Sequence, residues 1–348
     1  MAIEIIGTGR AVPARKVSND DLAAKIETSD EWIRSHTGIG SRYIADDDTV
    51  TSDLALEAAK NALAMAAGYS GDDPGERDRA AALEAKSLDM IVLGTCTPDF
   101  AGTPSTACIV QHGLGAENAG AMDVAAACTG FIYGLEAAAG MLTVSKKRKR
   151  ALVIGAEVLS KVVDWSDRGT CVLFGDGAGA VVLEKTDAPS EGPERRGLVR
   201  TALMADGSGA ESLLFRRGGT RFPFRPGETV EKGSHIEMNG QEVYNFAVKA
   251  VTDTIGALMR DEGLDKDDLA WIIPHQANAR IIQAAGKRLR IPAEKFFLNI
   301  EEYANTSAAS VPLALDEMNR GGKLKRGDTI MTVGFGGGLT YGGNVIIW

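Results

Sequence analysis

Cys128 is the residue whose surroundings best suit covalent chemistry. It lies in segment 122–131, where a strand-like start runs through small residues into a helical pattern that continues to residue 141. The positive end of a helix stabilises a thiolate and lowers the thiol pKa from its ordinary value of about 8.5, and small neighbours leave room for a thioester. The sequence therefore predicts an activated nucleophile at Cys128. A buried structural cysteine is the competing interpretation.

His275 and Asn305 lie in turns of a similar kind further along the chain. His275 follows the apolar run 271–273, and catalytic groups in α/β sheets gather just beyond the carboxyl ends of strands. Asn305 lies where another strand-end turn enters a helix, and an internal repeat makes this turn the counterpart of the Cys128 turn. A structural histidine and a helix-capping asparagine are the alternatives. If all three meet, they provide a nucleophile and two donors for oxyanion charge, which suits acyl transfer through a thioester.

A glycine-rich segment near the end of the chain, GFGGGL at 334–339, resembles a dinucleotide fingerprint only superficially. It leads into a closing strand and not into a βαβ unit, so phosphate binding is disfavoured. Backbone N–H groups that are not shielded by side chains make good oxyanion donors. A tight hairpin without a binding role is the alternative.

Two similar α/β halves are predicted to position these residues. Each half contains a helix, a buried strand, a second strand and a closing strand in the same order, about 180 residues apart. Strands that are apolar along their whole length belong to sheets covered on both faces. We therefore expect a layered α/β/α/β/α sandwich with halves 1–186 and 187–348, joined by a linker at 187–197. The helices are expected at 52–67 and 244–262, and the strands at 88–93, 151–155, 179–183, 269–273, 329–334 and 343–347.

Composition limits the function further. The 348 residues carry a net charge of −9, which argues against a nucleic-acid binder that relies on backbone charge. No membrane span or signal peptide is expected. The other cysteines, Cys96, Cys108 and Cys171, show neither metal-site spacing nor a disulfide framework, which indicates a reducing cytoplasm. With four histidines in the chain, we expect a reaction without a metal or other cofactor.

Four segments resemble a known family. They are DVAAACTGF around Cys128, PHQAN around His275, NTSAAS from Asn305 and the terminal FGGG. In this order they are similar to beta-ketoacyl-acyl carrier protein synthase III of the thiolase superfamily, over essentially the whole chain. The resemblance implies the thiolase-like five-layered fold, a homodimer and a role in initiating fatty acid biosynthesis. Acyl-CoA and malonyl-acyl carrier protein would be the substrates, and 3-oxoacyl-carrier protein the product.

The resemblance also implies roles for individual residues. Cys128 would be the acylated nucleophile, and His275 with Asn305 would stabilise the enolate that forms when the malonyl thioester loses carbon dioxide. The backbone N–H groups of Cys128 and Gly337 would form the oxyanion hole. The mechanism would be ping-pong, and a neutral His275 is required as a donor.

Binding residues follow from the same resemblance. Those expected to contact CoA are Thr28, Trp32, Arg168 and Asn278. The family docks its acidic carrier proteins around a segment that matches 276–280, and the helix there is predicted to present basic residues on one side. A solvated helix face without a partner is the alternative. The predicted docking residues are Gln276, Ala277, Asn278, Ala279, Arg280, Lys287 and Arg288.

The chain departs from the family pattern at three positions. His36 replaces an arginine, which puts one CoA contact in doubt, and Ala304 replaces a glycine before Asn305. Thr103 occupies a position that in the family reaches into the partner subunit's acyl pocket and is often a bulky aromatic residue. With Phe335, we assign it to the acyl pocket, and its small size indicates a deeper pocket than acetyl needs.

Three other functions compete with this interpretation. The first is a related ketosynthase-like acyltransferase of a specialised, polyketide-type pathway that uses an unusual acyl primer. The second is a papain-like hydrolase, because the order Cys, His, Asn and the gap of 147 residues (275 minus 128) fit that family. That match lacks the CGSCW-like signature and leaves the internal repeat unexplained. The third is a non-catalytic acyl-CoA-binding protein.

Overall fold

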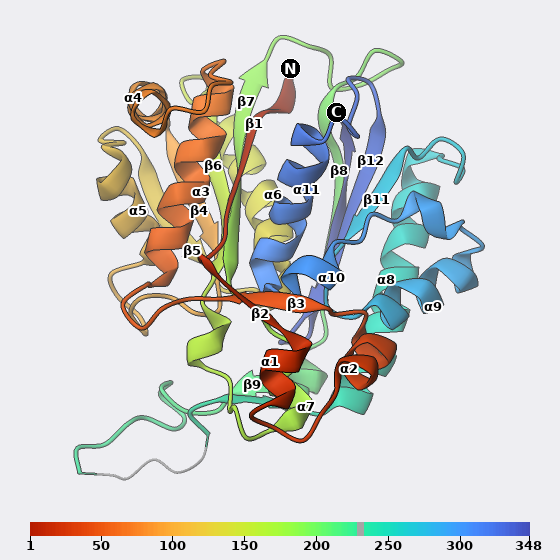
Figure 1. Cartoon of the computed structure of the whole chain (residues 1–348). Helices are drawn as coiled ribbons and strands as arrows, with labels where there is room; N and C mark the ends of the chain where they lie inside the picture. Colours follow the sequence, from red (N-terminus) through yellow and green to blue (C-terminus); the bar gives the residue numbers. More distant parts are fainter. Residues whose placement is uncertain (228–232) are drawn as a thin grey trace.

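The protein is built from five layers, which alternate helices and sheets (Figure 1). The computed structural model describes residues 1–227 and 233–348. Two mixed sheets each have one face against a shared pair of central helices and the other face against outer helices. The predicted five-layered α/β/α/β/α sandwich is therefore confirmed.

The two sheets follow the same pattern of pairing. In the first sheet, β4 pairs in parallel with β5 and β6, and β7 runs antiparallel between β6 and β1. In the second, β11 pairs in parallel with β12, and β13 runs antiparallel between β12 and β8. The strands of the first sheet, in spatial order, are β1 (Ala2–Ala11), β7 (Gly177–Thr186), β6 (Arg150–Glu157), β4 (Met90–Gly94) and β5 (Gly120–Val124). Those of the second are β11 (Trp271–Pro274), β12 (Thr329–Gly336), β13 (Thr340–Ile347) and β8 (Gly197–Ala205).

Two buried helices, α6 (Gly130–Thr143) and α11 (Ser310–Arg320), fill the space between the sheets (Figure 1). The core around them joins apolar side chains of both helices and both sheets, among them Leu135, Leu315 and Ile330, all nearly inaccessible to solvent. Burying a side chain of this kind contributes about 1.5–3 kcal/mol. Because both helices begin at the same end of the molecule, their first turns and the residues before them face a common region.

The outer helices bury one apolar stripe each. On α3, small and apolar residues recur at helical spacing, and Leu54, Ala58 and Ala62 pack on the first sheet. The long helix α8 is capped by Asn239, whose side chain accepts from Glu242 N, and ends at Gly263 in the left-handed conformation. The helices on the first sheet are α3 (Thr51–Ala66) and α5 (Thr106–Leu114), with α4 (Pro74–Ala85) packed on α3; those over the second are α8 (Gly240–Glu262) and α9 (Ala279–Leu289).

The strand order of one sheet can be superposed on that of the other. The sequence β1-β7-β6-β4 in the first sheet matches β8-β13-β12-β11 in the second, and a parallel bridge from Ile272 to Phe296 lies where β5 extends the first. β7 ends at Thr186 and β8 begins at Gly197, so the expected linker at 187–197 lies between the matched sets except for its last residue, which begins β8. A division of the chain at residue 186 stays a prediction.

Short elements form a cap over one end of the sandwich, in the lower part of Figure 1. They include the two-stranded sheets β2 with β3 and β9 with β10. Within residues 1–227 and 233–348, every helix is too short or too polar to span a lipid bilayer. The cap and connecting elements are β2 (Arg15–Ser18), α1 (Asn19–Ala23), α2 (Asp30–Thr37), β3 (Ser41–Ile44), η2 (Leu159–Lys161), α7 (Arg168–Cys171), η3 (Gly207–Ser212), β9 (Leu213–Phe215), β10 (Ile236–Met238), η4 (Ala293–Lys295) and α10 (Ile300–Tyr303).

Candidate active site

Cys128 lies in a one-turn 3-10 helix, η1 (Ala127–Thr129), directly before α6. The residue before it, Ala127, has φ +46, a left-handed conformation that is uncommon for a residue with a side chain. This sharp turn carries the chain from the end of β5 into the central helix. Glycines allow the close packing it needs: a Cβ on Gly130 would lie 2.9 Å from the Cα of Gly94 in β4.

His275 follows β11 directly, at the carboxyl end of the strand, where the sequence pattern predicts it. Its backbone N–H donates to Val333 O at 2.7 Å, which fixes it to β12. The imidazole is almost completely buried, and its Nδ1 lies 2.7 Å from the hydroxyl oxygen of Ser310. The ring of Phe335 packs edge-on against it, with centroids 5.2 Å apart. Burial lowers the pKa of His275 to about 3, so the ring is neutral at physiological pH, as its expected role as a donor requires.

Asn305 lies between α10 and the 3-10 helix η5 (Ser307–Ala309), which precedes α11. Its Oδ1 accepts a hydrogen bond from Ser307 N at 2.9 Å. Because the carbonyl oxygen is used in this way, the Nδ2 amide is the group left to donate into the site. Ala304, where the resembled family has glycine, adopts φ +56 and ψ −156. That region is populated essentially by glycine, so the substitution leaves a strained backbone beside Asn305.

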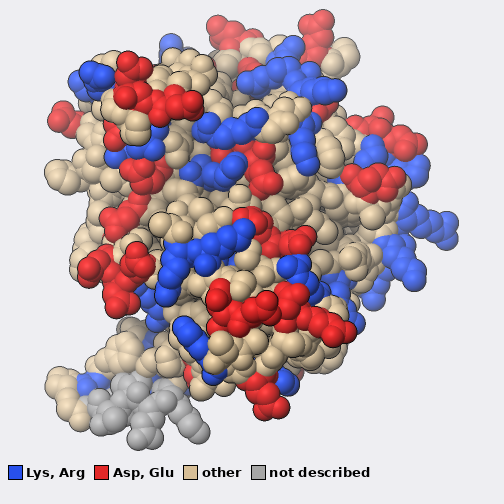
Figure 2. Space-filling view, in the orientation of Figure 1, with Lys and Arg blue, Asp and Glu red and all other residues tan. Residues whose placement is uncertain are grey.

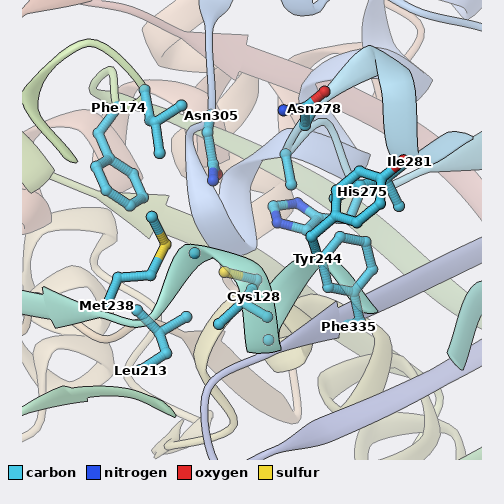
Figure 3. Close-up of a pocket in the computed structure, with 15 residues that line it drawn as sticks. Cys128, Phe174, Leu213, Met238, Tyr244, His275, Asn278, Ile281, Asn305 and Phe335 are labelled. Carbon is cyan, nitrogen blue, oxygen red and sulfur yellow. The ribbon is translucent and has the colours of Figure 1, made fainter. Parts of the chain in front are cut away.

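The three residues line one cavity of about 170 Å³, although they are far apart in the sequence. Figure 3 shows the sulfur of Cys128, the imidazole of His275 and the amide of Asn305 facing the same space. Apolar side chains surround them, including those of Phe174 and Leu213. A low-dielectric space of this kind strengthens any hydrogen bond made inside it. The expected convergence of the three groups is therefore present.

The expectation of a lowered thiol pKa is wrong for the free protein. Burial is the main cause that raises the pKa of Cys128 to about 12; the hydroxyl of Ser307 acts in the opposite direction, and the charge of Glu157 makes a smaller contribution in the same direction as burial. The sequence showed only that Cys128 lies at a helix N-terminus, which stabilises a thiolate. In the folded protein, packing also removes water from the sulfur. The resulting cost of a buried negative charge is larger than the stabilisation by the helix. Cys128 is therefore a neutral thiol in the free protein.

The glycine-rich turn after β12 lies against Cys128. A Cβ on Gly336 would lie 2.8 Å from the backbone N of Cys128, so only glycine fits there without displacement. Thr340 Oγ1 lies 3.1 Å from Ala126 O and 3.2 Å from Gly337 O, and it accepts from Thr129 Oγ1. This threonine links the two backbone segments in which the oxyanion donors, the N–H groups of Cys128 and Gly337, are expected.

A second, smaller cavity of about 120 Å³ also reaches Cys128. Its lining is apolar except for one hydroxyl and includes Ala127, Cys96 and Ile236. Phe335 lines the first cavity, where its ring packs against the imidazole of His275, and its assignment to the acyl pocket stays a prediction. Thr103 is exposed on a loop and lines neither cavity, and its expected contact with a partner subunit stays a prediction.

Two of the residues expected to bind CoA lie together at the surface of the cap. The guanidinium of Arg168 lies over the ring of Trp32, 4.9 Å from its centroid. His36 also stacks on Trp32, with centroids 4.5 Å apart and an interplanar angle of 21°. An aromatic ring with a cation at its face is a suitable platform for a purine base.

Thr28 and Asn278 have different surroundings. The hydroxyl oxygen of Thr28 is buried and has no hydrogen-bond partner within the described part of the chain. Asn278 lines the catalytic cavity, yet its amide is already used: Nδ2 donates to His36 O at 3.0 Å, and Oδ1 accepts from Arg280 N as the cap of α9. Asn278 therefore fixes α9 to α2, and its expected contact with CoA stays a prediction.

The predicted docking segment divides into buried and exposed residues. Gln276 is buried, donating to Pro274 O and Phe297 O, and Ala279 is also buried, so the prediction that these two contact a carrier protein is wrong. Ala277 and Asn278 line the catalytic cavity. Figure 2 shows Lys and Arg side chains gathered at the edge where α9 lies. The exposed cations there are Arg280, Lys287 and Arg288, and none forms an ion pair with any described residue.

Three residues that contact the site were not predicted from the sequence. Ser307 and Ser310 lie within the NTSAAS segment, and their spacing before and at the start of α11 was a usable signal. Glu157 is buried at the end of β6, and its carboxylate accepts from Thr97 Oγ1 at 2.6 Å and from Cys96 N at 3.1 Å. An acidic residue in the apolar run 151–159 was the signal for Glu157.

Comparisons of the sequence and of the structure with known proteins all match the same family. The family model described as 3-oxoacyl-[acyl-carrier-protein (ACP)] synthase III matches residues 122–210, and the model for its C-terminal part matches residues 259–348. A beta-ketoacyl-[acyl-carrier-protein] synthase III of Clostridium perfringens strain SM101 is 48% identical over 343 residues, which cover 99% of this chain and 98% of the relative. The crystal structure of the 3-oxoacyl-[acyl-carrier-protein] synthase III of Aquifex aeolicus VF5 superposes with a TM-score of 0.85 at 41% identity, covering both chains completely. The priming beta-ketosynthase of the R1128 polyketide pathway superposes with the same TM-score at 33% identity, covering 99% of this chain and 96% of its own.

Proposed function

This chain belongs to the beta-ketoacyl-[acyl-carrier-protein] synthase III family of condensing acyltransferases, and on that premise we propose how its own residues carry out the reaction. An acyl group passes from acyl-CoA to Cys128 and is then condensed with a malonyl-carrier protein, which initiates fatty acid biosynthesis. The observation that carries the proposal is the single cavity lined by Cys128, His275 and Asn305. The reaction needs no bound cofactor, because CoA and the carrier protein arrive as thioester substrates.

The first half-reaction forms the acyl-cysteine. The sulfur of Cys128 attacks the thioester carbonyl, the bond from that carbonyl to the CoA sulfur breaks, and the proton of Cys128 leaves on the CoA thiol. Charge that develops on the carbonyl oxygen is stabilised by the backbone N–H groups of Cys128 and Gly337. One such donor is commonly worth about 2.7–4 kcal/mol. Because the pKa of Cys128 is raised, the thiol proton is still present when the attack begins, and it leaves on the CoA sulfur.

The second half-reaction forms the carbon–carbon bond. The malonyl thioester loses carbon dioxide, and negative charge moves to its thioester oxygen. His275 and Asn305 donate to that oxygen, a role supported by the neutral imidazole and by the engaged Oδ1 of Asn305. The enolate carbon then attacks the acyl carbonyl, the bond to Cys128 breaks, and the thiolate regains a proton from water. Two neutral donors suit this step because neither loses its own proton.

We also propose where the two substrates bind and how the protein assembles. CoA is placed with its purine at Trp32 and Arg168, and an acidic carrier protein docks on the exposed cations of α9. A homodimer is supported by the position of β5 at the edge of the first sheet, as far as the described residues show, and by the exposed loop around Thr103. A cytoplasmic location is supported by four free cysteines.

A reconstituted reaction tests this function. The enzyme is incubated with malonyl-carrier protein and a panel of acyl-CoA primers, and the carrier is weighed by intact-mass spectrometry while carbon dioxide release is measured. We expect 3-oxoacyl-carrier protein with one carbon dioxide released per product, and the preferred primer identifies the acyl group. Hydrolysis of acyl-CoA without a malonyl-dependent product would contradict the proposal.

A further inference from the structure

We propose that Ser310 is a positioning residue that holds the neutral imidazole of His275 in the tautomer with its proton on Nε2. The inference rests on the function proposed above, in which His275 must donate into the cavity. Ser310 is the first residue of α11, and its hydroxyl oxygen lies 2.7 Å from His275 Nδ1. Both side chains are buried, with exposed fractions of 2% and 1%. Among the described residues, this hydroxyl is the only hydrogen-bond partner of the imidazole.

The Ser310 hydroxyl has one proton and two possible acceptors. One is His275 Nδ1, and the other is the carbonyl oxygen of Ser307, at 2.9 Å. If the hydroxyl donates to Nδ1, the ring proton lies on Nε2 and faces the cavity. If it donates to Ser307 O, Nδ1 carries the ring proton and Nε2 is a bare acceptor. The tautomer of the catalytic histidine is thus tied to the orientation of a single O–H bond.

Two features favour donation to His275. The carbonyl oxygen of Ser307 already accepts the backbone N–H of Ser310, so it is satisfied without the hydroxyl. In addition, Nδ1 faces the N-terminal end of α11, an eleven-residue helix. The positive potential of a helix N-terminus favours a lone pair over an N–H group at that place. Both effects keep Nδ1 unprotonated and leave Nε2–H for the substrate.

This tautomer also matches the rest of the cavity. Asn305 Oδ1 accepts from Ser307 N, which leaves the Nδ2 amide to donate to a group in the site. An enolate oxygen that receives the amide N–H can also receive an N–H from His275 only if Nε2 is protonated. Ser307 and Ser310, on neighbouring turns, therefore set the donor direction of both side chains.

The test combines a spectroscopic signature with separate kinetics of the two half-reactions. In full-length enzyme labelled with ¹⁵N-histidine, the chain's four histidines give few signals, and His275→Asn assigns the one of interest. We expect a protonated Nε2 and a hydrogen-bonded, unprotonated Nδ1 in the native enzyme. Ser310→Ala should shift the Nδ1 signal, and Ser310→Thr, which keeps a hydroxyl, should restore it.

Kinetically, Ser310→Ala should slow the malonyl-dependent step by about tenfold, the effect of losing one hydrogen bond of ordinary strength. Acylation of Cys128 by acyl-CoA should change much less. The matched control is Ser41→Ala, because the Ser41 hydroxyl is also buried and donates only to backbone carbonyls, at 2.9 Å from Glu302 O. It should leave both steps and the histidine signals unchanged.

Three results would overturn the proposal. One is a native enzyme with the proton on Nδ1, and another is a Ser310→Ala variant with unchanged histidine signals and condensation rate. The third is an equal slowing of both half-reactions together with a lowered melting temperature, which indicates a structural role only. A native enzyme that shows no condensation at all refutes the proposed function instead, and the tautomer can still be measured in it.

Discussion

At the scale of the residue, burial decides the protonation of Cys128 and His275. It raises the pKa of Cys128 and lowers that of His275, so both are neutral near pH 7. A neutral pair is suited to a reaction in which negative charge develops on substrate oxygens and not on the protein. The site gains its electrostatic effect from fixed donors, which need no reorganisation during the reaction.

The thiol pKa of Cys128 predicts how alkylation depends on pH. Only the thiolate reacts, so the rate of Cys128 modification by iodoacetamide should rise about tenfold per pH unit from pH 7 to 10, without a plateau. Peptide mapping by mass spectrometry separates Cys128 from the exposed Cys108, which serves as an internal reference. A plateau below pH 8 would show a thiolate in the free enzyme and contradict this account.

The lowered pKa of His275 predicts that the folded protein loses stability in acid. Its pKa is about 3 in the folded protein and lies near 6.5 in the unfolded chain, so the unfolded chain binds one more proton between these values. The stabilisation is complete above pH 6.5 and is lost as the pH falls towards 3, by about 1.4 kcal/mol per pH unit. His275→Asn lacks this contribution, and urea unfolding of both proteins across this range measures the difference. A difference independent of pH would refute the assignment.

Individual residues differ in how far the sequence predicted them. Cys128, His275 and Asn305 stood out because each lies where a strand ends and a helix begins, and such ends meet at one edge of a layered fold. The thiol pKa was predicted in the wrong direction because desolvation depends on every side chain around the sulfur. Gln276 was misplaced for a similar reason: a polar side chain after a strand looks exposed until its partners, Pro274 O and Phe297 O, are known.

At the scale of the element, small residues let the central helices approach the sheets. The first residue of α6, Gly130, packs against Gly94 of β4. This contact fixes the helix whose first turn follows the nucleophile, so the position of Cys128 depends on backbone packing as well as on its own turn.

Gly130→Ala and Gly140→Ala form a matched pair within α6. The first places a Cβ 2.9 Å from backbone at Gly94, so it should cost about 1–3 kcal/mol of unfolding free energy and lower the acylation rate of Cys128. The second meets no atom within 4 Å on an exposed face and should stabilise the helix by up to about 1 kcal/mol without changing the rate. Thermal unfolding and single-turnover acylation measure both effects. Equal behaviour of the two variants would contradict the close-packing account.

The hydrophobic periodicity of the sequence predicted most helices and strands, but it did not predict the residues at which they begin and end. The helix expected at 244–262 begins at Gly240, because Asn239 caps it in a segment that reads as a loop. The strand expected at 88–93 is β4, Met90–Gly94. The 3-10 helices η1 and η5 were not predicted, because their conformations, with φ +46 at Ala127 and +49 at Ser307, are imposed by tertiary packing and not by local preference.

At the scale of the whole molecule, two sheets of equivalent topology enclose one site. The nucleophile follows a strand of the first sheet, whereas His275 and the glycine-rich turn follow strands of the second. The internal repeat made this arrangement predictable from the sequence. The sequence did not predict that two cavities reach Cys128, because their shapes depend on how β9, β10 and the cap pack over the site.

The charge distribution predicts a selective effect on the carrier protein. In the double variant Arg280→Glu, Lys287→Glu, two exposed cations of α9 become anions. This variant should have a KM for malonyl-carrier protein that is about tenfold higher, and its acylation by acyl-CoA should be unchanged. Lys147→Glu, an exposed cation before β6 at the far end of the first sheet, is the matched control and should have no effect. Steady-state kinetics at two salt concentrations measure this. An equal effect of all three reversals would show that only net charge matters.

The central claim is that Cys128 carries the acyl group, and one measurement tests it most directly. The enzyme is incubated with acyl-CoA alone, and the modified peptide is identified by mass spectrometry. We predict one acyl group per chain, located on Cys128, lost in Cys128→Ser and retained in Cys96→Ser, whose sulfur lines the neighbouring cavity. An acyl group on another residue, or malonyl-dependent turnover in Cys128→Ser at the native rate, would contradict the account.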